Sequence, residues 1–289
     1  MFTLTRHVLD YMASRRAAGV YGQKSQRVVA PRLHDFARSH GNRPIHHVNT
    51  QTVERWLAEL DHRGVARNTK ACYLVSVRAF CAWMVDRGHL AANPCDGVPP
   101  IRRDRPVPRA QSTANVAKII DACTDDRERA IVWLMVGCGL RRMEVAGLRW
   151  EHWDDRAGII EVRHSKFGRE RVLPVPDEVA AVLGRLRGGG MTGPIIESKR
   201  DPHQAISVEH VGRVVRRVME RAGVKHRPYD GVSGHALRHT CASDVLDRSH
   251  DLRVVQAMLG HQSLQASSVY LRRATPEQLR EAMAGRTYA

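Results

Sequence analysis

The sequence lacks the features that are typical of membrane proteins and secreted proteins. No apolar run approaches the length needed to span a bilayer, and residues 1–16 contain no apolar core of a secretory signal. The six cysteines form no C-x-x-C pair and lie mostly in apolar helical contexts. They are therefore predicted to be reduced core residues, with no disulfide framework and no zinc site. These absences predict a cytoplasmic protein that has no membrane partner and no bound metal.

Acidic residues are scarce relative to basic ones. The chain has 46 Lys and Arg against 30 Asp and Glu, a formal net charge of +16. The positive charges of such a chain repel one another unless a bound polyanion neutralises them. Nucleic acid is the first candidate partner, because neutralising phosphates releases counterions. An anionic membrane surface is the alternative, but it favours one concentrated basic run. The basic residues are instead spread along the whole chain, which favours a long basic groove.

Residues 1–96 are predicted to form a helical N-terminal domain. Apolar residues recur there at steps of three and four, and glycines separate the segments. Four amphipathic helices are expected, at Leu4–Ala17, Gln26–Ser39, Thr52–Leu60 and Thr69–Val85. Pro31 leaves the start of the second helix open, because proline belongs in the first turn of a helix. Residues 97–110 are rich in Pro and Arg and predict a linker after this domain.

Residues 111–289 are predicted to form a second domain of mixed secondary structure. Two short β-prone runs, Ile159–Arg163 and Arg169–Pro174, lie on either side of Ser-Lys-Phe-Gly and indicate a hairpin. Helices are expected around this hairpin, at Ala114–Cys123, Arg127–Val136, Asp177–Leu186, Val208–Ala222, His235–Leu246, Leu252–Leu259, around Tyr270 and at Pro276–Met283. The predicted fold class is therefore mainly α with a small β-sheet (α+β).

An arginine at a predicted helix start is the first candidate for chemistry. Arg141 follows Gly139 and begins a helix, where the helix dipole prefers acidic residues. This position suggests that Arg141 meets another anion. Glu144 lies three residues on, on the same helix face, and could orient it. Taken alone, a surface ion pair explains these two residues better.

Two further segments carry basic side chains. Lys166 lies at the tip of the predicted hairpin, where the simpler interpretation is a solvated turn lysine. His235 and Arg238 share one face of their helix, since they are three residues apart. Leu237, Cys241 and Val245 form the other, apolar face, so the His–Arg pair is expected to point away from the core. A phosphate contact and a solvated helix start explain this pair equally well.

The last segment contains Gly260, His261 and Tyr270. Gly260 is the expected end of the helix Leu252–Leu259. His261 follows directly and is free to turn toward a site, and Tyr270 follows nine residues later. By itself, Tyr270 is an ordinary half-buried helical tyrosine.

In order along the chain, these segments resemble the motifs of the tyrosine recombinase (phage integrase) family. G-L-R-R-M-E-V-A-G-L-R-W at residues 139–150 is similar to the first motif of that family. G-H-A-L-R-H-T at 234–240 and L-G-H-Q-S followed by Tyr270 are similar to its second, and S-K-F-G-R-E-R-V-L-P-V at 165–175 to its lysine hairpin. Arg142 and Cys138 depart from the pattern, since a small or apolar residue and a threonine are usual there.

The resemblance implies a role for each of these residues. Arg141 and Arg238 would hold the scissile phosphate, and His235 and His261 would complete its pocket. Lys166 would be the general acid and Tyr270 the nucleophile, with Glu144 supporting Arg141. The N-terminal part would be a SAM-like core-binding domain and residues 111–289 the catalytic domain. The implied function is that of an Xer-like simple site-specific recombinase acting on double-stranded DNA.

The chemistry of these residue types fits the implied reaction. Attack on a phosphodiester builds negative charge on oxygens, which fixed guanidiniums stabilise. A free tyrosine has a pKa near 10 and needs a cationic pocket or a base to react at neutral pH. A phosphotyrosine ester conserves the energy of the cut strand, so no ATP, metal or other cofactor is expected. The sequence also offers no convincing carboxylate cluster for a metal.

Other functions and assemblies stay open at this point. A type IB topoisomerase or resolvase-like enzyme would use similar chemistry, and a catalytically silent DNA-binding relative would retain the fold. The resemblance implies a homotetramer on DNA, in which a C-terminal helix at Pro276–Met283 docks on the neighbouring protomer. Docking of that helix within its own chain is the alternative. The lack of a further N-terminal domain favours a simple recombinase.

Overall fold

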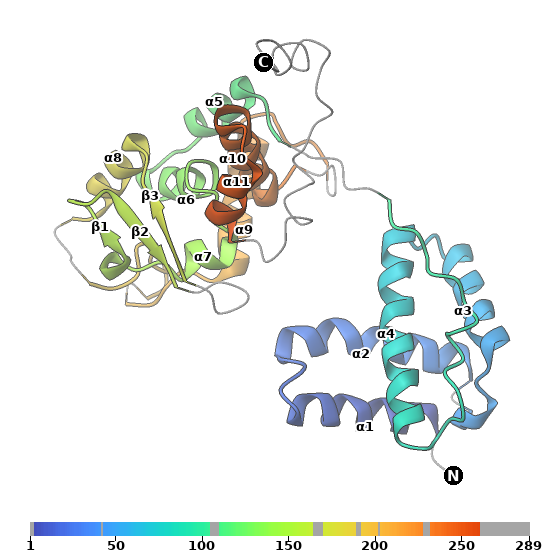
Figure 1. Ribbon diagram of the computed structural model, residues 1–289. Helices are drawn as coiled ribbons and strands as arrows, with labels where there is room; N and C mark the ends of the chain where they lie inside the picture. Colours follow the sequence, from blue (N-terminus) through green and yellow to red (C-terminus); the bar gives the residue numbers. More distant parts are fainter. Residues whose placement is uncertain are drawn as a thin grey trace, which may run out of the picture. The chain divides into compact units, whose positions relative to one another are not determined.

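The computed structural model describes residues 3–41, 43–104, 110–163, 170–188, 192–201, 203–227 and 232–260. The chain divides into two compact units, Met1–Arg105 and Pro106–Ala289 (Figure 1). None of the helices in the described ranges is long and apolar enough to cross a membrane.

The first unit is helical. Its helices are α1 (Leu4–Ala17), α2 (Gln23–Ser39), α3 (Thr50–His62) and α4 (Arg67–Asp86), with a short 3₁₀ turn at Ile45–His47. The helix α4 packs against the other three and crosses α1 and α2 in Figure 1. Its apolar residues recur at steps of three and four, so one face is buried along its length, including Leu74, Val77 and Phe80.

Aromatic side chains fill the core of this unit. Tyr11 of α1 lies edge-on to Phe80 of α4, with ring centroids 5.4 Å apart. Phe36 of α2 packs in the same manner on Trp56 of α3, at 5.0 Å. The indole N–H of Trp56 donates to a carboxylate oxygen of Asp35 at 3.1 Å, so its one polar group is satisfied although the ring is buried.

The expected start of α2 at Gln26 is wrong, because the helix begins at Gln23 and continues through Pro31. Proline inside a helix loses one backbone hydrogen bond and crowds the preceding turn. The helix nevertheless continues, since the part after Pro31 contributes three completely buried residues to the core, Leu33, Phe36 and Ala37. Tertiary packing therefore outweighs the local preference at this position.

The second unit places a small sheet beside a group of helices. In chain order its elements are α5 (Thr113–Asp121), α6 (Asp126–Val136), α7 (Arg142–Ala146), a 3₁₀ turn (Trp150–His152), β1 (Trp153–Asp154), β2 (Ile159–Val162), β3 (Arg171–Pro174), α8 (Asp177–Leu186), α9 (Val208–Arg221), α10 (Gly234–Ser249) and α11 (Leu252–Leu259). The strands are antiparallel in the order β1-β2-β3, with Ile160 opposite both Trp153 and Leu173.

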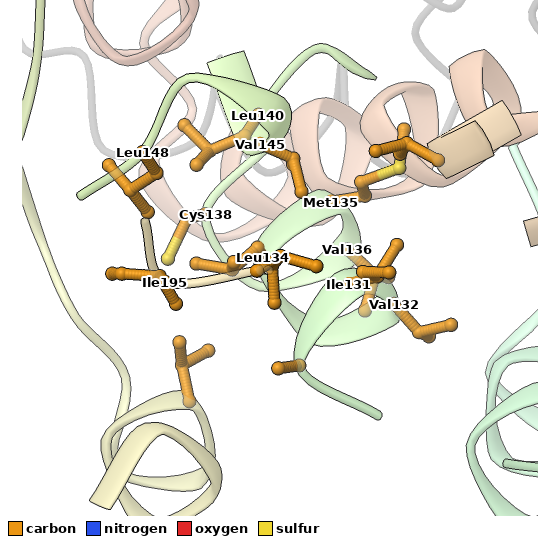
Figure 2. Packing of buried hydrophobic residues seen from close by; sticks show 14 of the residues in the cluster. Ile131, Val132, Leu134, Met135, Val136, Cys138, Leu140, Val145, Leu148 and Ile195 are labelled. Atoms are coloured by element: carbon orange, nitrogen blue, oxygen red, sulfur yellow. The ribbon is translucent and has the colours of Figure 1, made fainter. Parts of the chain in front are cut away.

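The central helix of the second unit is α6. It packs against α5, α7, α8, α9 and α10. Figure 2 shows its side chains Ile131, Leu134 and Met135 among apolar residues from the segments that follow, including Val145 and Ile195. Most residues of α6 are buried in this core, including Ala130, Val132 and Val136.

The expected α+β class is confirmed, and α1, α8 and α11 have the predicted bounds. The strand β1 was not predicted, because two residues are too few for a period-two pattern. The helices expected around Tyr270 and at Pro276–Met283 lie outside the described residues. The limits of 1–96, 97–110 and 111–289 for domains and linker stay a prediction.

Candidate active site

The turn between α6 and α7 positions Arg141. Gly139 has a φ of +63° in this turn, which is the left-handed region that favours glycine. A Cβ atom there would lie 3.2 Å from Leu259 Cδ2 and 3.4 Å from Cys241 Sγ, so the turn also packs tightly against α10 and α11. Arg141 follows as the N-cap of α7 and keeps 23% of its side chain exposed.

Glu144 is the anion on which several arginines converge. Its side chain is fully buried. It accepts the Arg141 backbone N–H at 2.8 Å and Arg141 Nη1 at 2.9 Å. Burial alone would raise the pKa of Glu144, but hydrogen bonds and charge from Arg171, with the Arg141 backbone N–H and nearby Arg238, hold the pKa below its usual value. The predicted contact between Glu144 and Arg141 is confirmed, as a buried site instead of a surface pair.

Arg238 is buried, so the expectation that it points away from the core is wrong. Only 1% of the residue is exposed. Its guanidinium donates to the carbonyl oxygens of Gly139 and Leu259, and Nη1 lies 3.6 Å from Glu144 Oε2. Burial of a guanidinium is feasible here because two carbonyl oxygens accept its hydrogen bonds and a carboxylate close by balances its charge.

Arg141 and Arg238 lie side by side. Both donate to the same carbonyl oxygen, that of Leu259, at 3.4 Å from Arg141 Nη1 and 2.6 Å from Arg238 Nη2. Two guanidiniums at one point would repel each other without Glu144 between them. The arrangement therefore concentrates positive charge beside the end of α11, with only Arg141 partly exposed.

His235 lies in the first turn of α10 and is exposed. Its pKa is lowered to about 4, first because its ring is partly shielded from water by neighbouring atoms and then because of the positive charges of His239, Arg238, Arg141 and Arg142. At neutral pH, His235 is therefore a neutral imidazole that can accept or donate a hydrogen bond.

Arg171 is a functional candidate that sequence reasoning missed. It donates Nη1 and Nη2 to the two carboxylate oxygens of Glu144 at 3.0 and 2.9 Å, and Nε to the Met258 carbonyl at 2.8 Å. A signal was available, since Arg171 and the buried Leu173 are two residues apart in β3 and share a face of the strand. Arg171 thereby joins the start of β3 to α7 and to the end of α11.

Three candidates, Lys166, His261 and Tyr270, lie outside the described residues. The described elements end close to them in sequence. Val162 ends β2 and Arg171 begins β3, on either side of the segment that contains Lys166. The helix α11 ends at Leu259 and Gly260, with His261 next in the chain. The roles expected for these three residues stay predictions.

No group of His, Cys, Asp and Glu in the described ranges is arranged to hold a metal ion. Among the described residues of the site, Glu144 is the one buried carboxylate, and arginines already bind it. The described part of the site can therefore bind and stabilise an anion through Arg141, with Arg238 and Arg171 held behind the same carboxylate.

Comparison with known proteins gives matches to both parts of the chain. The model of the phage integrase family matches residues 111–277, and that of the phage integrase N-terminal SAM-like domain matches residues 27–88. The tyrosine recombinase XerC of Xylella fastidiosa (strain 9a5c) is 32% identical over 226 residues, which cover 75% of this chain and 74% of that protein. XerC of Pseudomonas putida (strain KT2440) is 30% identical over 274 residues, covering 90% and 86%.

The fold has known counterparts among solved structures. A lambda integrase tetramer bound to a Holliday junction matches with a TM-score of 0.76 and 19% identity, over 91% of this chain and 78% of that one. At this identity the likeness concerns the fold alone. The integrase model, however, spans more than half of the chain, and XerC relatives align over most of it. The resemblance seen in the motifs is thus confirmed: the chain belongs to the phage integrase family and is a site-specific tyrosine recombinase.

Proposed function

We propose that this recombinase cuts duplex DNA by attack of Tyr270 on a phosphodiester, and that it rejoins strands without metal or ATP. The observation that carries the proposal is the convergence of Arg141 and Arg238 on Glu144 and on the Leu259 carbonyl. Two cations fixed at one point suit the charge that develops on a phosphate during in-line displacement.

The step would proceed as a transesterification. Tyr270 Oη gives its proton to a base, for which His235 is the candidate, and bonds to phosphorus. The bond from phosphorus to the 5′-oxygen breaks, and a 3′-phosphotyrosyl link forms. Lys166 would donate the proton that the 5′-oxygen takes up. The reverse reaction, with a 5′-hydroxyl from another strand, rejoins the DNA and frees Tyr270.

The other residues of the site would bind the phosphate or move protons. The Arg141 side chain is partly exposed and would contact a non-bridging oxygen of the phosphate, while Arg238 adds charge beside it. His235 is neutral at pH 7 and would hydrogen-bond the phosphate or accept a proton. His261 would complete the pocket. A bound phosphate would raise the pKa of His235, because its charge opposes that of the neighbouring arginines.

The assembly that we propose is a homotetramer on DNA. Support comes from the shared fold with the lambda integrase tetramer on a Holliday junction and from the net charge of +16. The C-terminal segment, Pro276–Met283, would dock on a neighbouring protomer. Acting on DNA agrees with the cytoplasmic location that the sequence predicts.

A suicide substrate tests the chemistry. A DNA site selected from a random pool is nicked next to the cut position, so that the cleaved strand cannot be rejoined. Wild type should give a covalent protein–DNA adduct in buffer with EDTA, and Tyr270→Phe should give none. An adduct with Tyr270→Phe, or a requirement for metal, would overturn the mechanism. Relaxation of supercoiled plasmid at many sites without strand exchange would instead support the topoisomerase alternative.

A further inference from the structure

A basic cavity lies next to His235 in the second unit. It has a volume of about 580 Å³ and lies between α7, α9 and the start of α10. Among the described residues that line it, four are permanent cations, namely Arg142, Arg213, Arg216 and Lys225, and Glu209 is the one carboxylate. This charge balance favours a polyanion over a neutral or cationic ligand.

The cations of this cavity differ in how far they are engaged. Arg216 lies 3.6 Å from Glu220, and the ammonium of Lys225 donates to the carbonyls of Arg227 and Val232. Arg142 and Arg213 are exposed, and no hydrogen bond or ion pair joins their guanidiniums to the part of the chain that the structure describes. Two guanidiniums therefore line the cavity with donors that the described residues leave available.

The position of Arg142 depends on a glycine. The helix α7 packs against α9 (Figure 1). The Arg142 side chain passes over Gly212 of α9. A Cβ atom at residue 212 would lie 2.6 Å from Arg142 Nη1 and 3.4 Å from its Cδ. Glycine in a helix interior is less favourable than alanine. Gly212 therefore lowers the stability of α9, but the absence of a Cβ atom leaves room for this guanidinium.

We propose that Arg142 and Arg213 bind a second DNA phosphate, next to the one that is cut. His235 lines this cavity, and the positive charges of Arg141, Arg142 and Arg238 lower its pKa. The cavity thus adjoins the scissile-phosphate site, as neighbouring phosphates on one strand require. The site at Arg142 rests on the proposed function, and it assigns a role to a residue that departs from the usual family motif.

The salt dependence of DNA binding tests this subsite. Binding of the full chain to a labelled 40-base-pair duplex is measured by fluorescence anisotropy at several salt concentrations. Loss of one phosphate contact should lower the slope of log K against log[salt] by about 0.9 and weaken binding by roughly five- to tenfold at 0.1 M salt. We expect this change for Arg142→Gln. Arg156→Gln is the matched control, because Arg156 is exposed in the turn at the opposite end of β2 from the hairpin.

A thermodynamic cycle with Gly212→Ala separates the position of Arg142 from its charge. The added methyl group displaces the guanidinium but keeps every charge, and alanine favours the helix. Gly212→Ala should weaken DNA binding in the wild-type background and have no further effect in the Arg142→Gln background. Equal losses in both backgrounds, or an unchanged salt slope in Arg142→Gln, would overturn the proposal.

Replacement of single phosphates by neutral methylphosphonates locates the subsite on the selected DNA site. One replacement next to the cut phosphate should weaken binding of wild type but not of Arg142→Gln. If no replacement has this effect, the subsite is not a phosphate site of the cut strand and the proposal fails. The covalent adduct of wild type is scored separately, so a failure of the Tyr270 mechanism is distinguishable from a failure of the subsite.

Discussion

Arg171 binds the buried carboxylate of Glu144 with both terminal nitrogens, at 3.0 and 2.9 Å, and the Arg171 side chain is only 9% exposed. This pair is closer to a core contact than to a surface salt bridge. It is also the link between the strand that follows the Lys166 segment and the carboxylate that holds Arg141.

Arg171→Met should destabilise the second unit and slow adduct formation. It leaves Glu144 buried with fewer donors, and breaking a buried pair typically costs about 3–5 kcal/mol. Arg171→Lys keeps the charge but loses the bidentate geometry, so its effects should be smaller. Urea unfolding gives the stability, and single-turnover cleavage at saturating DNA gives the rate. A rate equal to that of wild type in Arg171→Met would contradict a positioning role.

Glu144→Gln should change how stability depends on pH. The pKa of Glu144 is lower in the folded chain than its ordinary value of 4.5. Its contribution to stability is therefore fully present above pH 4.5 and is lost as the pH falls through the lower, folded pKa. The unfolding free energy of wild type should fall more steeply below pH 4.5 than that of Glu144→Gln. Parallel curves would show that Glu144 does not titrate as its surroundings indicate.

His235 should titrate near pH 4 in the free protein. Its pKa is lowered from 6.5 to about 4, so the folded state binds fewer protons than the unfolded state between these values. Its contribution to stability is present above pH 6.5 and declines as the pH falls toward 4. NMR of labelled histidine, assigned with His235→Gln, measures the midpoint directly. A midpoint above 6 in the absence of DNA would refute the assignment of a neutral His235.

Gly139→Ala should reduce both stability and cleavage. A non-glycine residue at a φ of +63° is strained by roughly 1–2 kcal/mol, and here the Cβ atom also meets Leu259 and Cys241. Gly158→Ala is the control, because Gly158 has a φ of +64° with nothing within 4 Å of its Cβ position. Thermal unfolding should show a larger loss for Gly139→Ala. Equal losses would mean that the packing of this turn adds nothing to its strain.

The sequence predicted elements better than it predicted burial. Periodic segments such as α8 and α11 were expected at their observed bounds, because a regular apolar face and clear end signals act locally. Arg238 was misjudged because its burial depends on the carbonyls of Gly139 and Leu259, which are remote in sequence. The role of Arg171 was missed for the same reason, because its partner Glu144 is remote in sequence and lies on a helix that precedes the sheet.

Candidate residues were found from their order and motifs, and the structure adds how they are held. Arg141 and Glu144 were expected to interact, and they do. That a single carboxylate serves Arg141, Arg171 and Arg238 could not be read from spacing, because it requires α7, β3 and α10 to meet.

The carbonyl of Leu259 accepts donors from Arg141 and Arg238, and that of Met258 accepts one from Arg171. These are the last two residues of α11, directly before the segment that contains His261 and Tyr270. A force on that segment that unwound the end of α11 would break hydrogen bonds of all three arginines at once. Tension on the segment that contains Tyr270 would thus reach Arg141, Arg171 and Arg238 through the end of α11, within a single chain.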